Sequence, residues 1–371
     1  MNVKALADIL NSVFYTGVPD SQLKSLCDYL MQQEGISTGH IIAANEGNAV
    51  ALAAGEYLAT GRIPVVYMQN SGIGNAVNPI LSLINEKVYG IPCIFIVGWR
   101  GEPGVHDEPQ HIRQGELTLQ LLEDLGLRVY VIDTNTTEND IRQELAGAAE
   151  WFKQGQSIAF VVKKGALQNE AGVQYQNSYS LLREEVIRCI TEVSDQDAIV
   201  ATTGKAGREL YEIREQSGQP HKYDFLTVGS MGHCSSIALG IAMNKPDKKV
   251  WCIDGDGAVL MHLGAMAVIG NRKPGNLVHI VINNEAHESV GGMPTVADTM
   301  DIPQIALGCG YESAVSLQTM EALREQLKKA KAASVLSLIE IKCAIGARAD
   351  LGRPKTSPKE NRDSFMEYLR A

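Results

Sequence analysis

The chain alternates between short apolar runs and longer segments in which apolar residues recur with helical spacing. Near-continuous apolar strands that alternate with helices predict parallel sheets covered on both faces. The strands expected in the first half are 40–45, 63–68, 91–98, 128–133 and 157–164, with helices at 46–60 and 117–125. The strands expected in the second half are 198–204, 249–257, 277–284 and 334–345, with helices at 236–243, 260–270 and 317–333.

A polar, glycine-containing stretch without clear periodicity separates the two series, and this pattern is typical of a linker. We therefore expect a first domain over 1–165, a linker over 166–180 and a second domain over 181–371 with a C-terminal tail. The expected fold class is α/β, with each domain a mainly parallel sheet flanked by helices.

Composition narrows the class of protein. The net charge of −10 argues against a general nucleic-acid or membrane-surface binder, although local cations can still hold an anionic substrate. The N-terminus lacks the layout of a signal peptide, and no segment is long and apolar enough to span a bilayer. The seven cysteines are scattered without metal-binding spacing, which is typical of reduced thiols and predicts a cytoplasmic protein.

The second half contains a spaced motif after an expected strand. Asp256 stands between Gly255 and Gly257, and the 25 residues 258–282 separate this turn from Asn283 and Asn284 at the end of the next strand. A glycine turn lets the backbone approach a phosphate, and the following helix offers its N-terminal N–H groups. Asp256 and Asn284 supply hard oxygens that suit Mg²⁺. Gly-Asp-Gly alone is more often only a strand-to-helix turn.

With its strand–helix–strand context, the full motif resembles the diphosphate and Mg²⁺ motif of thiamine diphosphate-dependent enzymes. The resemblance implies two domains of the thiamine diphosphate-binding fold and implies that Asp256, Asn284 and the carbonyl of Ala286 bind Mg²⁺. It also implies that thiamine diphosphate is bound by Thr202, Thr203, Gly204, Gly229, Gly255, Gly257, Ala258, Asn284 and Ala286, with Met231 as the residue that wedges the cofactor into its bent shape. The neighbouring Lys205 either holds the diphosphate or is a solvated loop cation.

Glu46 provides an independent test in the other half. It follows an expected strand and opens a helix of small residues. Taken alone, it is an ordinary first-turn Glu stabilised by the helix dipole. The resemblance instead implies that Glu46 is the catalytic Glu that hydrogen-bonds the aminopyrimidine ring of the cofactor.

The two-domain build narrows the resemblance, because the linker is too short for the middle domain of the larger carboligases. The chain resembles the family of phosphonopyruvate and sulfopyruvate decarboxylases in the segments TGVPDS (16–21), DEPQHIRQG (107–115), NNEAHESVGGMPT (283–295) and RADLGRP (348–354). The resemblance implies decarboxylation of 3-phosphonopyruvate to phosphonoacetaldehyde and CO₂ in phosphonate biosynthesis. The alternatives are a sulfopyruvate decarboxylase, a thiamine-dependent carboligase and a non-catalytic nucleotide-binding module.

Two residues are candidates for moving the proton that replaces CO₂. Asp20 lies in the turn where related decarboxylases carry an Asp, and His111 lies in an expected loop where they carry histidines. Asp after Pro is also a standard turn residue, and a loop His is often only packed or solvated. The sequence leaves open which of the two acts.

A phosphonate dianion needs cations, and the planar fork of Arg matches its oxygens. The candidates for contact with substrate are Arg113, Arg348, Arg353 and His287. The segment with Arg348 and Arg353 follows the last expected strand, so it either closes over the site or packs against a partner subunit. The resemblance also implies a homodimer or homotetramer with active sites between subunits, acting on a small anionic 2-keto acid.

Overall fold

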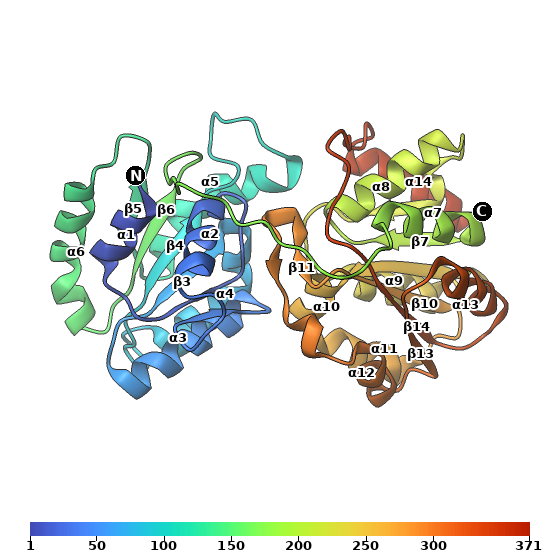
Figure 1. The fold of residues 1–371 in the computed structure, drawn as a ribbon, viewed down its shortest axis with the longest axis horizontal. Coiled ribbons are helices and arrows are strands. Elements are labelled where there is room, and N and C mark those ends of the chain that lie inside the picture. The colour runs from blue at the N-terminus through green and yellow to red at the C-terminus, as the bar shows by residue number, and fades with distance from the viewer. The chain divides into compact units, whose positions relative to one another are not determined.

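The computed structural model describes all residues 1–371 and divides into two compact units, Met1–Gln174 and Tyr175–Ala371. Each unit is a parallel sheet between helices (Figure 1). The expectation of an α/β protein with two such domains is confirmed. The segment 166–168 of the expected linker pairs with the N-terminus, since Gln168 bridges to Asn2 and its carbonyl accepts the Val3 N–H.

The N-terminal unit is built on a six-stranded sheet with the order β2-β1-β3-β4-β6-β5. All of its pairings are parallel. Its strands are β1 (Tyr15–Gly17), β2 (His40–Ile42), β3 (Val65–Gln69), β4 (Ile94–Gly98), β5 (Arg128–Ile132) and β6 (Ile158–Val162). The three central strands are buried on both faces, which explains their continuous apolar runs.

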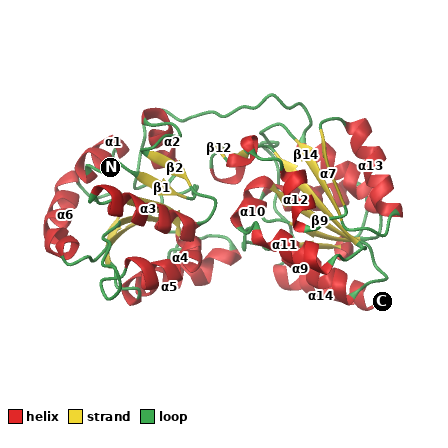
Figure 2. Cartoon of the chain, turned by 90° about the horizontal axis from the view of Figure 1, so that it is seen from below, coloured by secondary structure: helices red, strands yellow, loops and turns green.

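Helices cover both faces of this sheet. They are α1 (Val3–Leu10), α2 (Lys24–Gln33), α3 (Glu46–Thr60), α4 (Ile73–Pro79), α5 (Pro109–Asp124) and α6 (Glu138–Lys153). One core joins α3, α4 and α5 to alternate residues of the strands, such as Val66 and Phe95. Figure 2 shows α1, α2 and α6 on the side of the sheet away from α4 and α5.

The C-terminal unit repeats this plan with the strand order β13-β14-β10-β9-β7-β8, again all parallel. Its strands are β7 (Ala198–Ala201), β8 (Asp224–Leu226), β9 (Val250–Gly255), β10 (Leu277–Asn283), β13 (Ser313–Leu317) and β14 (Ser337–Lys342). A small antiparallel pair, β11 (Ala286–His287) and β12 (Met293–Pro294), stands beyond β10.

Two buried cores flank the second sheet. Its helices are α7 (Arg183–Ser194), α8 (Lys205–Gln216), α9 (Cys234–Asn244), α10 (Asp256–Met261), α11 (Gly264–Arg272), α12 (Ile302–Cys309), α13 (Met320–Ala332) and α14 (Pro358–Arg370). Helices α7, α8 and α13 pack on one face. Helices α9, α11, α12 and α14 pack on the other, so that α13 and α14 lie on opposite sides (Figure 2).

Several local expectations are wrong. The expected helix 260–270 is interrupted, because α10 ends at Met261 and α11 begins at Gly264. The segment 107–115 is not only a loop, since Pro109 opens α5.

No helix reaches the length and apolar character required to cross a bilayer.

Candidate active site

Glu46 is the first residue of α3, and the N-terminal end of that helix fixes its position. Asn45 caps the helix by accepting the Gly47 N–H at 2.8 Å. The Glu46 side chain is buried, and its Oε2 accepts a hydrogen bond from Asn75 Nδ2 on α4 at 2.7 Å. Burial raises the pKa of Glu46 above its usual value. A buried carboxyl with a raised pKa is suited to exchange a proton.

Gly72 packs against Glu46, a contact that sequence reasoning missed. It precedes α4 with an ordinary right-handed conformation, yet a Cβ at this position would overlap the Glu46 carboxylate. The motif Ser71-Gly72-Ile73 gives no sign of this contact, because only the fold brings it to Glu46.

We expect Gly72→Ala to fold normally but to lose at least about 100-fold in turnover, because a displacement of about 1 Å in a reacting group has this effect. Gly74→Ala, two residues later in α4, is the matched control, since a Cβ there meets nothing within 4 Å. Steady-state kinetics with circular dichroism would check the pair. Equal activity of the two variants would contradict the role assigned to Gly72.

Asp20 lies at the carboxyl ends of neighbouring strands. Its Oδ1 accepts a hydrogen bond from Gln69 Nε2 at the end of β3, at 2.5 Å. Its Oδ2 is buried without a hydrogen-bond partner and packs against Gly98 at the end of β4. Burial raises the pKa of Asp20. A buried, unpartnered carboxyl oxygen at this edge of a parallel sheet indicates a functional group.

The other two candidates of this unit lie on the first turns of α5. His111 is buried, and its backbone carbonyl packs against Gly101. Arg113 is 76% exposed and pairs with Glu116 at 2.8 Å on the same helix. The contacts of Arg113 are thus those of a surface ion pair, and its role in substrate binding stays a prediction.

The C-terminal unit carries further candidate residues at the carboxyl ends of β9 and β10. Asp256 is buried at the start of α10, and its Oδ2 accepts the hydroxyl of Thr295 at 2.6 Å. Burial raises the pKa of Asp256 to about 6, against the lowering effect of the Thr295 hydrogen bond. Thr295 was not among the predicted residues.

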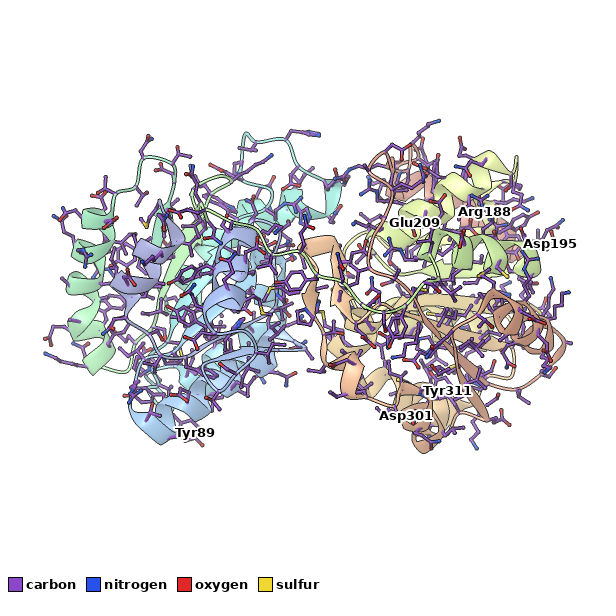
Figure 3. All side chains as sticks on the ribbon, in the orientation of Figure 1. Tyr89, Arg188, Asp195, Glu209, Asp301 and Tyr311 are labelled. Atoms are coloured by element: carbon purple, nitrogen blue, oxygen red, sulfur yellow. The ribbon has the colours of Figure 1, made fainter.

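Asn284 is oriented by its neighbours. Its Nδ2 donates to Glu288 at 2.7 Å, and its Oδ1 accepts the Ala286 N–H at 3.2 Å. Glu288 is held by Arg183 at 2.6 Å, and Arg183 also binds Glu209 through two hydrogen bonds. Glu209 comes from α8 in the C-terminal unit (Figure 3). This buried network fixes which end of the Asn284 amide carries the oxygen, as outer-shell partners of metal ligands do.

The glycine turn of the motif forms a narrow cradle. A Cβ at Gly257 would lie 3.2 Å from His287 Nδ1 and 3.3 Å from Met231 Cε, so the three predicted residues come together. Burial lowers the pKa of His287 to about 4, so its ring is neutral at pH 7. Ala258 and Thr202 are buried near the same strand ends. The cradle and the oxygen donors fit a diphosphate with its cation.

The predicted residues after β7 lie beside this turn. The Gly229 N–H donates to Thr203 Oγ1 at 3.0 Å, and Gly204 has a φ of 98°, which favours glycine. Lys205 is not a solvated loop cation, because its Nζ binds Glu288 at 2.9 Å.

The C-terminal segment with Arg348 and Arg353 is held on the surface of its own unit. The Arg348 guanidinium pairs with Glu184 at 2.7 Å, with Asp350 at 2.9 Å and with Glu212. Three carboxylates therefore surround this cation. The predicted contact of Arg348 with substrate stays a prediction, as does that of Arg353.

The raised pKa of Asp256 would make the predicted binding of a cation by this carboxyl depend on pH. Below about pH 6 the metal-free carboxyl holds a proton, which a cation must displace. We therefore expect the Kd for Mg²⁺ to rise about tenfold per pH unit below 6 and to be nearly flat from 7 to 8. Calorimetric titration in the presence of thiamine diphosphate would measure it. Thr295→Val removes a hydrogen bond that lowers the pKa of Asp256, so the pH at which Mg²⁺ binding weakens should be higher in this variant. The same pH dependence in the variant and wild type would contradict the role of Asp256 in cation binding.

Comparison with known protein families agrees with this architecture. Residues 3–122 match the family described as thiamine pyrophosphate enzyme, N-terminal TPP binding domain. Residues 202–341 match thiamine pyrophosphate enzyme, C-terminal TPP binding domain. These ranges include Glu46 and Asp256, respectively.

Curated proteins match over nearly the whole chain. A phosphonopyruvate decarboxylase from Streptomyces viridochromogenes is 33% identical over 95% of this chain and 90% of its own length. One from Streptomyces hygroscopicus is 32% identical over 95% of this chain and 89% of its own. A sulfopyruvate decarboxylase from Methanosarcina acetivorans is 28% identical over 87% of this chain and 86% of its own length. The chain therefore belongs to the phosphonopyruvate decarboxylase family of thiamine pyrophosphate enzymes.

Proposed function

We propose that this protein decarboxylates 3-phosphonopyruvate to phosphonoacetaldehyde and CO₂ and requires thiamine diphosphate with Mg²⁺. The observation that carries the proposal is the buried Glu46 carboxyl, whose pKa is raised, in a domain of the thiamine pyrophosphate family. A nucleotide-binding module would have no use for this group. The nearly full-length similarity to two phosphonopyruvate decarboxylases supports the substrate.

The residues of the C-terminal unit would hold the cofactor. Asp256, Asn284 and the carbonyl of Ala286 would bind Mg²⁺, and the backbone of Gly257 at the start of α10 would approach the diphosphate. Thiamine diphosphate, when bound, supplies the electron sink that decarboxylation of a 2-keto acid needs. In the N-terminal unit, Glu46 would hold a proton at Oε1 while Asn75 keeps its other oxygen in place.

Asp20 is the better candidate for supplying the proton that replaces CO₂. Its Oδ2 is buried and without a partner, and its raised pKa keeps a proton more available than an ordinary Asp would. His111 remains the second candidate. We further propose a homodimer or homotetramer in the cytoplasm, which analytical ultracentrifugation and fractionation would test.

Substrate preference tests the proposal. We expect kcat/KM for 3-phosphonopyruvate to exceed that for sulfopyruvate and pyruvate by at least about tenfold, because a dianionic end makes more charge-assisted hydrogen bonds. A higher kcat/KM for sulfopyruvate would identify sulfopyruvate as the substrate, and the proposed decarboxylation would still hold. Carbon–carbon bond formation between two keto acids would instead identify a carboligase.

A further inference from the structure

A cavity of about 230 Å³ opens between loops that follow three strands of the N-terminal unit. Ser21 comes from the loop after β1, Arg100 and His106 from the segment after β4, and Lys164 from the end of β6. The carboxyl ends of parallel strands are where such sheets bind ligands. None of these residues was predicted as a member of the site.

Arg100 is positioned within this cavity by its own neighbours. Its Nε and Nη2 bind the two oxygens of Asp107 at 2.8 and 2.5 Å, and its Nη1 donates to Ser21 at 3.2 Å. These bonds use three of the five N–H groups of a guanidinium, which leaves one on each Nη for a ligand. The side chain is 22% exposed, so this fork is preorganised and partly shielded from water.

The two carboxylates in the lining are already occupied. Asp107 binds the Arg100 fork and also accepts the N–H groups of Gly101 and Glu108 at 2.9 and 2.8 Å. Glu102 pairs with Lys163 at 2.6 Å. Lys164 is exposed and adds a second cation to the lining of the cavity. An entering anion therefore meets the two remaining N–H groups of Arg100, whose charge is partly offset by Asp107, and the exposed cation of Lys164.

The cavity adjoins the buried Asp20. Ser21 and Gln22 of its lining directly follow Asp20 in the chain, and Arg100 interacts electrostatically with the Asp20 carboxyl. A short substrate whose reacting carbon lies at Asp20 would therefore place its far end near Arg100.

We propose that Arg100, supported by Ser21 and Lys164, binds the phosphonate group of the substrate in this cavity. The inference rests on the proposed function for the identity of the substrate, while the anion site itself rests on the geometry of the N-terminal unit. It assigns the anionic end to Arg100, which lines this cavity, rather than to Arg113 or Arg348, which are not among its lining residues.

The test uses 3-phosphonopropanoate, which has a carboxylate and a phosphonate but no ketone. Binding to the full-length protein without cofactor is measured by calorimetry, so the result does not depend on turnover. We expect Arg100→Gln and Lys164→Gln each to weaken binding at least about tenfold. Arg142→Gln and Lys153→Gln, on exposed ion pairs of α6, are the charge-matched controls and should bind like wild type.

Kinetics supply the second arm. The two variants should lower kcat/KM for 3-phosphonopyruvate at least about tenfold and that for pyruvate less than about threefold, since pyruvate lacks the second anion. Wild-type binding by Lys164→Gln and Arg100→Gln would overturn the inference even if decarboxylation proceeds. If the two variants bind 3-phosphonopropanoate weakly but the wild-type protein has no decarboxylase activity, the anion site would be supported and the proposed function would be wrong. Lys164 is exposed, so its variant keeps the test valid if Arg100→Gln does not fold.

Discussion

Glu46→Gln should reduce turnover by about 100-fold to 10,000-fold while the protein still folds, because it removes a carboxyl positioned for proton transfer. Gln keeps the size of the side chain, and its amide oxygen can still accept the hydrogen bond from Asn75. Burial raises the pKa of Glu46 because the site disfavours a charge. The uncharged Gln should therefore be tolerated there without loss of stability. Stopped-flow or steady-state assays of CO₂ release, with thermal unfolding alongside, would measure both effects.

Glu56→Gln, later on α3, is the matched control and should keep wild-type turnover. Binding of thiamine diphosphate, followed by quenching of protein fluorescence, should change less than turnover in Glu46→Gln. If Glu46→Gln turned over substrate as fast as Glu56→Gln, the catalytic role of Glu46 would be wrong.

Asp256→Asn should have opposite effects on function and on stability. Loss of the carboxylate should weaken Mg²⁺ binding by about 100-fold or more and abolish most turnover, because the charge of the ligand set governs the affinity for a hard cation. The buried ionised carboxyl destabilises the metal-free fold, since its pKa is about 6 rather than 3.8. At pH 8 the variant without metal should therefore be more stable than wild type, by about 3 kcal/mol.

Proton linkage determines how the stability difference between Asp256→Asn and wild type changes with pH. A carboxyl whose folded-state pKa is raised stabilises the fold below its unfolded pKa of 3.8, and this contribution is lost as pH rises through about 6. The stability gain of Asp256→Asn should therefore shrink towards pH 5. Denaturant titrations at pH 5 and pH 8, with and without Mg²⁺, would show it. A variant less stable than wild type at pH 8 would contradict the account of this carboxyl.

Elements with long apolar runs or clear caps could be predicted from the sequence. Helix α3 occupies the predicted range 46–60, since Asn45 caps it and Gly61 ends it in a left-handed conformation. Strands β1, β8 and β13 were missed, because β1 and β8 have three residues each and β13 is only half-buried. The predicted helix 117–125 covers only the second half of α5, because the polar residues after Pro109 hid its first turns.

The candidate site divides in the same way. Asp256, Asn284 and Glu46 were predicted because they stand at fixed places in motifs of local strand and helix ends. Gly72, Thr295 and Arg100 were missed because their roles come from contacts with residues distant in the sequence. Arg348 was predicted to contact substrate from its place in the sequence, but in the fold its guanidinium pairs with carboxylates that include Glu184 and Asp350.

The central claim is tested most directly by ³¹P NMR of the products formed from 3-phosphonopyruvate, with thiamine diphosphate and Mg²⁺ added or withheld. We expect stoichiometric phosphonoacetaldehyde and CO₂ only when both are present, and none from Glu46→Gln on the same timescale. Unchanged 3-phosphonopyruvate in the presence of folded, cofactor-loaded protein would contradict the account.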